Sequence, residues 1–108
     1  MYNLMLYFSA KESNLEVTQF LIDNYGANVD EALEIAAQHS NIVAAQFLIN
    51  HYGANACVAI GIAVEMFPPN KYAIESLIMH LEQSDFEEAI EILGNHDLNQ
   101  YVHMVENF

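Results

Sequence analysis

The fold is decided by a stretch that occurs twice, as NLEVTQFLIDNYGAN at residues 14–28 and as NIVAAQFLINHYGAN at residues 41–55. The two copies start 27 residues apart and are identical at nine of their fifteen positions. A fixed period of this size is the sequence signature of a protein built by stacking similar units. We therefore expect an array of repeats.

Weaker copies of the pattern extend it in both directions. EALEI at residues 31–35 has a counterpart in EAIEI at residues 88–92, and AIGIA at residues 59–63 matches the alanine-bounded run at residues 32–36. The 108 residues suit one domain of ordinary size. The sequence predicts a single domain over residues 1–108 with four units, roughly 1–28, 29–55, 56–84 and 85–108.

Each unit has the pattern of two short helices. In the second unit, apolar residues around Leu33 and Ala36 fall on one face at helical spacing, and polar residues fall on the other. Asp30 is the expected N-cap of the first helix. Gly26 and Gly53 are expected to end the second helices with a positive φ. No segment alternates with period two for long, which predicts an all-α fold, a short solenoid of helix-turn-helix units.

Residues 14–55 resemble the ankyrin repeat. The runs LEV at 15–17, FLI at 20–22 and GAN at 26–28 stand where that family has its second helix and its Gly-Ala-Asp/Asn end. The Thr-Pro-Leu-His motif does not occur, and the unit is shorter than the family's, which has about 33 residues. The residues of the β-turn finger are missing. The resemblance implies a finger-less, ankyrin-like solenoid that binds proteins, and a generic α-hairpin solenoid is the alternative.

Acidic residues far outnumber basic residues in this chain. Fifteen acidic residues face two lysines, Lys11 and Lys71, which gives a net charge of −13. Such a surface repels phosphate backbones and anionic lipids, so we expect no nucleic-acid partner and no membrane partner. It favours a protein partner with a basic surface. The alternative is that the charge only keeps an apolar chain in solution.

Targeting signals are not apparent. Cys57 is the one cysteine and lies in an apolar run, which predicts a small core residue and no internal disulfide. The first residues lack a basic segment and a cleavage pattern. We expect a cytoplasmic protein. Short irregular ankyrin arrays resemble those of intracellular bacteria and large DNA viruses. By that analogy alone, the alternative is an effector that is delivered into a host cell.

The sequence offers no catalytic, cofactor or metal motif. The five histidines have no metal-ligand spacing, and the pairs Glu31/Glu34 and Glu88/Glu91 are typical of solvated helix faces. We expect no catalytic residues, no cofactor and no metal. The alternative, a small hydrolase or metal-dependent enzyme, stays open.

The resemblance to ankyrin repeats implies that a partner binds on the concave face formed by the first helices of successive units. Gly61 in the middle of a helix costs about 1 kcal/mol relative to alanine, which predicts close approach of a partner or of the neighbouring helix. The partner-binding residues predicted from the outward positions are Tyr7, Glu31, Glu34, Gln38, Val58, Gly61, Glu65, Glu88 and Glu91.

Both terminal helices are apolar nearly all round. Terminal units of a solenoid need a polar outer face, so uncapped ends predict a homodimer or a permanent partner. We expect a homodimer, with an interface drawn from Leu4, Phe8, Tyr101, Met104 and Phe108.

Together these observations predict a protein-protein interaction module without catalytic chemistry. It would bind its partner through an acidic helical face and apolar terminal helices. In a sharper form of this hypothesis the protein inhibits or regulates one enzyme by covering a basic active-site rim.

Overall fold

The computed structural model describes residues 2–12, 14–66 and 69–107, and over these ranges it is all-helical, without a strand. This confirms the predicted fold class at the level of secondary structure. The helices are α1 (Tyr2–Lys11), α2 (Leu15–Tyr25), α3 (Val29–Gln38), α4 (Ile42–Tyr52), α5 (Ala56–Glu65), α6 (Lys71–Ile78), the short 3-10 helix η1 (Gln83–Asp85), α7 (Phe86–Asn95) and α8 (Asn99–Glu106).

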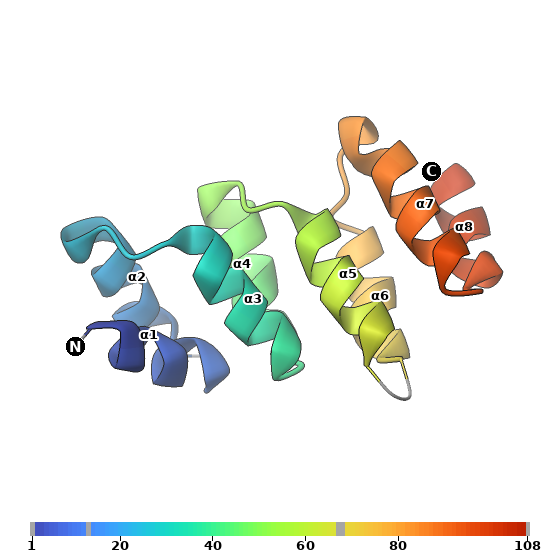
Figure 1. Cartoon of the computed structure of the whole chain (residues 1–108). Coiled ribbons are helices and arrows are strands. Elements are labelled where there is room, and N and C mark those ends of the chain that lie inside the picture. Colours follow the sequence, from blue (N-terminus) through green and yellow to red (C-terminus); the bar gives the residue numbers. More distant parts are fainter. Residues whose placement is uncertain (1, 13, 67–68, 108) are drawn as a thin grey trace.

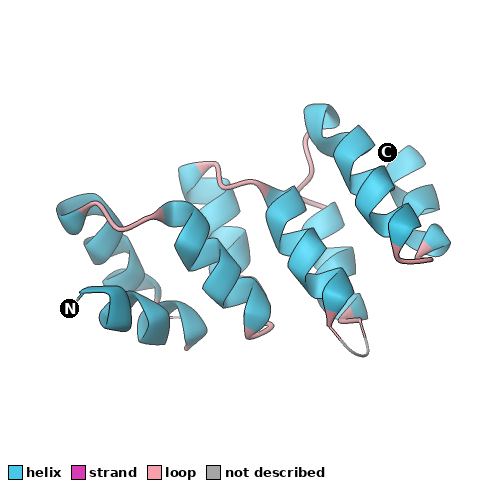
Figure 2. Ribbon diagram, viewed as in Figure 1, coloured by secondary structure: helices cyan, strands magenta, loops and turns pink. Residues whose placement is uncertain are grey.

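The helices pack in consecutive pairs, α1 with α2, α3 with α4, α5 with α6 and α7 with α8. The pairs stand side by side in two rows (Figures 1 and 2). We call α1, α3, α5 and α7 the first-helix layer, and α2, α4, α6 and α8 the second-helix layer. Neighbours within the first-helix layer are in contact along the whole row. The result is a slab of 41 × 28 × 17 Å.

Asparagine caps the N-termini of five successive helices, α2 to α6. In each case the side-chain oxygen accepts a backbone N–H of the first turn and satisfies a donor that the helix itself leaves unpaired. The N-cap of α3 is Asn28 and not Asp30, which lies inside the helix. That expectation was wrong because both residue types make good caps and only the backbone shows which of them precedes the first helical residue. The five asparagines are Asn14, Asn28, Asn41, Asn55 and Asn70.

Gly26 and Gly53 end α2 and α4 in the left-handed conformation, with φ of 65° and 70°. The predicted C-terminal glycines are confirmed. The loops 26–28 and 53–55 then lead directly into the next helix. Ser40 and Asp97 also have positive φ, in the turns that lead into α4 and α8. After the second of these turns the residue that precedes α8 is Leu98, whose side chain is buried and makes no cap hydrogen bond.

The core lies between the two layers and runs the length of the slab. Leu33 and Ile60 from the first-helix layer meet Leu48 and Ile74 from the second, and all four are fully buried. Small alanines fill many of the positions between neighbouring pairs and let the helices approach closely. None of the helices in the described part of the chain is both long and apolar enough to cross a membrane.

Polar bonds tie each pair to the next. The Asn41 amide donates to the carbonyl oxygens of Ala10 and Lys11, both at 3.0 Å, while its oxygen caps α4. Asn70 donates to the hydroxyl of Ser40 at 2.7 Å. On the second-helix layer, the Tyr52 hydroxyl donates to Asp23 at 2.8 Å. These bonds fix the spacing of the pairs and therefore the spacing of the side chains on the outer faces.

Candidate binding surfaces

Four rows of outward-facing side chains cross the first-helix layer, one row on each helix. They occupy equivalent positions of the repeated helix pair. The rows are Leu4, Tyr7 and Lys11 on α1; Glu31, Glu34 and Gln38 on α3; Val58, Gly61 and Glu65 on α5; and Glu88, Glu91 and Asn95 on α7.

The rows on α3 and α7 are acidic and exposed to solvent. Glu31, Glu34, Glu88 and Glu91 are all exposed, as expected for carboxylates on the side of the helix opposite the core. Within the described ranges, the one close contact between a carboxylate and a basic side chain is that of His103 with Glu106 at 3.3 Å, on α8. The charge of the two acidic rows is therefore not neutralised by the protein itself.

The row on α5 lies between the two acidic rows and is mostly apolar. Val58, Gly61 and Ile62 are half-buried, and Glu65 stands at the far end of the helix. We call Val58, Gly61 and Ile62 the α5 strip. A Cβ added at Gly61 would meet no atom within 4 Å, so the neighbouring helix does not approach it closely. Of the two alternatives predicted for Gly61, close approach of the neighbouring helix is therefore wrong. The glycine leaves open space in the strip.

The row on α1 is held by aromatic contacts. The half-buried Tyr7 ring packs edge-on against His39 of the next pair, with ring centroids 5.5 Å apart. The ammonium of Lys11 lies 5.7 Å from the centre of the Tyr7 ring, within the range of a cation–π contact. The row on α1 is thus apolar and basic, whereas the rows on α3 and α7 are acidic.

The N-terminal end of the slab exposes large apolar side chains. Leu4, Met5 and Phe8 on α1 are each about half exposed or more. A shallow groove of about 270 Å³ runs between α1 and α2, where its lining includes Met5, Phe8 and Val17. The predicted interface residues Leu4 and Phe8 therefore lie at an open apolar end.

The C-terminal end differs from its prediction. Tyr101 is only 2% exposed, and Val105 is also buried, because α8 turns this face onto α6 and α7. Met104 is half-buried, and Phe108 lies outside the described residues. The expectation of an exposed apolar C-terminal helix was wrong for Tyr101. The side chains that α8 exposes are polar: Asn99, Gln100, His103 and Glu106.

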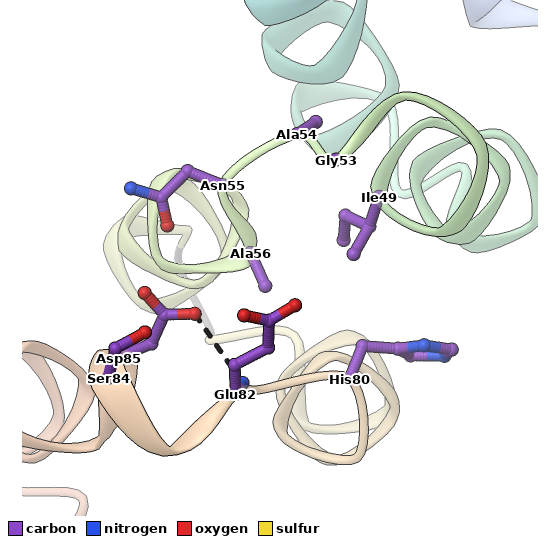
Figure 3. A pocket seen from close by; sticks show the side chains of 9 residues that line it. All are labelled: Ile49, Gly53, Ala54, Asn55, Ala56, His80, Glu82, Ser84 and Asp85. Carbon is purple, nitrogen blue, oxygen red and sulfur yellow. Dashed lines mark hydrogen bonds between the residues drawn. The ribbon is translucent and has the colours of Figure 1, made fainter.

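A polar pocket of about 190 Å³ opens beside the N-terminus of α5 (Figure 3). Glu82 and Asp85 hold each other in a capping box, in which the Glu82 N–H donates to the Asp85 carboxylate at 3.4 Å. The His80 imidazole points away from them (Figure 3) and contacts Asn50 at 3.1 Å. Among the described residues no group of three or more His, Cys, Asp or Glu side chains is placed to hold a metal ion.

Cys57 is a core residue, as the sequence predicts. Its thiol is buried and lies 3.5 Å from the carbonyl oxygen of Asp85. Burial, reinforced by the charges of Glu88 and Asp85, raises the pKa of this thiol to about 12. A thiol with so high a pKa carries almost no thiolate near neutral pH and makes a poor nucleophile.

Sequence reasoning missed the roles of Met5, Val17 and the capping asparagines. Asn14 and Asn41 begin the two copies of the repeated stretch, and Asn28 and Asn55 end them, so their recurrence was a usable signal. In the sequence, Met5 is one of several apolar residues in the first helix. Nothing in a single sequence distinguishes an apolar residue that faces the core from one that faces outward at an end.

Comparison of the chain with protein-family models, with curated proteins and with solved structures finds no match.

Proposed function

We propose that this protein is a binding module, an ankyrin-like solenoid of helix pairs whose first-helix layer captures a basic, amphipathic helix of a partner protein. The observation that carries the proposal is the α5 strip, an apolar surface with open space at Gly61 between the acidic rows of α3 and α7. An apolar stripe with lysines or arginines on both sides would match it in polarity and charge.

The two parts of this surface would contribute differently. Burying apolar area on Val58 and Ile62 supplies affinity, since each square ångström of apolar surface removed from water is worth about 25 cal/mol. The exposed carboxylates supply mainly faster encounter and choice of partner, because solvated charge pairs contribute little net energy. A net charge of −13 extends the attraction beyond the contact surface.

Binding without catalysis is part of the proposal. The paired carboxylates of α3 and α7 are exposed on the helix surface and do not lie in either of the two pockets described above. The Cys57 thiol is buried and its pKa is raised. These observations support a binding surface over a reaction centre.

The test measures binding of a labelled synthetic helix with leucines on one face and lysines on its flanks. Glu31→Gln with Glu34→Gln should weaken binding roughly 2- to 30-fold, because each exposed charge contact is worth about 0.2–1 kcal/mol. The matched control is Glu75→Gln with Glu106→Gln, which removes the same charge from exposed sites on the second-helix layer. It should bind almost as the unmodified protein does.

Two further measurements sharpen the test. Raised salt should weaken binding of the leucine–lysine helix, and a leucine–glutamate helix should not bind. If both double variants lose affinity equally, net charge and not the first-helix layer would explain the binding. If the leucine–lysine helix does not bind at all, the proposal is wrong.

A further inference from the structure

Certain positions that are buried in the inner helix pairs are exposed in the first pair. Ala32 and Ala59 occupy equivalent places in α3 and α5 and are both 0% exposed. Met5 has the same place in α1, 27 residues before Ala32, and is 49% exposed. Since α1 has no described helix before it, the position is buried only where another pair stacks on it.

The second-helix layer shows the same relation. Val17, Ala44 and Ala73 each donate their backbone N–H to the capping asparagine of their own helix, which makes their positions equivalent. Ala44 and Ala73 are buried, whereas Val17 is only half-buried. Met5 and Val17 line one groove. The N-terminal end therefore presents a stacking surface with apolar side chains larger than those of the inner pairs.

This end also differs from the C-terminal end in charge. The only charged residue of α1 is Lys11, and Glu12 and Glu16 follow it closely. Residues 85–108, in contrast, contain six acidic residues and no lysine or arginine. Two copies of a chain with net charge −13 therefore repel each other less when their N-terminal ends meet than when their C-terminal ends meet. The presence of both signs at this end also allows a two-fold contact to pair Lys11 of one copy with a glutamate of the other.

We infer that two copies of this chain associate head to head, with the Met5, Phe8 and Val17 surface of one copy stacked on the same surface of the other. A two-fold contact of this kind is closed, because each surface is covered by its own counterpart and no further copy can add. The dimer goes beyond the proposed binding function and does not depend on it. It would carry two first-helix layers and bind partners bivalently.

The experiment measures mass by light scattering over a range of micromolar concentrations. The unmodified protein should have twice the monomer mass of 12.2 kDa. Met5→Glu puts a charge into the stacking surface and should weaken dimerisation at least about tenfold, which corresponds to 1.4 kcal/mol. The matched control is Met79→Glu, because Met79 is 66% exposed and lies outside this surface. It should remain a dimer.

Circular dichroism of both variants separates dissociation from unfolding. If Met5→Glu does not fold, Val17→Lys tests the same surface from α2. A monomeric mass for the unmodified protein would overturn the inference. So would a dimer that survives both end variants, or one that Met79→Glu disrupts as strongly as Met5→Glu.

Discussion

The two ends of the slab are built from the same kind of helix pair and finish it in opposite ways. At the N-terminal end, Met5 and Phe8 stand about half exposed. At the C-terminal end, Tyr101 and Val105 turn inward and the exposed side chains are polar. One end is closed by its own residues and the other is left open. A repeated pattern therefore sets the architecture, while a few side chains decide whether an end can be stacked upon.

The largest expected effect comes from truncating an aromatic residue at each end. Tyr101→Ala should lower the free energy of unfolding by about 3 kcal/mol, because it opens a cavity under α8. Phe8→Ala should lower it by less than about 1 kcal/mol, because the ring is half exposed. Urea unfolding of both variants, at concentrations low enough to keep the protein monomeric, measures the difference. Equal losses would mean that the two ends are not finished differently.

A smaller effect separates an end asparagine from an inner one. Asn41→Ala removes the cap of α4 and two hydrogen bonds to the preceding pair, and should cost about 2 kcal/mol. Asn14→Ala removes the cap of α2 and should cost about 1 kcal/mol. Thermal unfolding of the two variants tests this order. The reverse order would show that the bonds from Asn41 to α1 add nothing to stability.

The contact between the first two helix pairs, which includes the hydrogen bond from Tyr52 to Asp23, should lose stability at alkaline pH. Partial burial, the hydrogen bond to Asp23 and the charge of Asp23 raise the pKa of Tyr52 from 10.0 to about 12. The folded protein holds this proton more tightly than the unfolded chain does, so the linked stability is complete below pH 10 and is lost as the pH rises through 12.

Tyr52→Phe should remove part of that alkaline loss, with a change below about 1 kcal/mol at neutral pH. Asp23→Asn should lower the pKa of Tyr52, because the amide keeps an acceptor and removes the charge. Melting curves between pH 10 and 12 and the absorbance of the phenolate measure the two effects. A Tyr52→Phe variant with the same alkaline profile as the unmodified protein would contradict the assignment.

The smallest effect concerns chemical access at the two ends. Cys57 is buried in α5 next to Asp85, which immediately precedes the C-terminal helix pair, and the pKa of its thiol is raised to about 12. We expect no reaction with a disulfide reagent in the native protein at neutral pH and full reaction in denaturant. A cysteine introduced as Met5→Cys in the monomeric protein should react at once. Rapid native reaction of Cys57 would show that the closed end opens readily.

The clear part of the repeat predicted the fold best. The glycines that end α2 and α4 and the acidic rows of α3 and α7 follow from residue type and helical spacing alone. Tyr101 shows where this stops. Its apolar character is visible in the sequence, but its burial depends on how α8 lies against α6 and α7. The same holds for Gly61. The sequence shows that a glycine destabilises this helix, but only the packed structure shows the open space beside it.

Asn41 precedes α4 and Leu98 precedes α8, at equivalent positions of their helix pairs. This difference should make the stability of the two pairs respond differently to cooling. The inner pair is joined to its neighbour by directed hydrogen bonds from Asn41, whereas the last pair has a buried leucine at this place. Apolar contacts weaken on cooling. In the cold, amide hydrogens of α7 and α8 should therefore exchange with solvent sooner than those of α3 and α4, so that the end that is closed at room temperature becomes the first to fray.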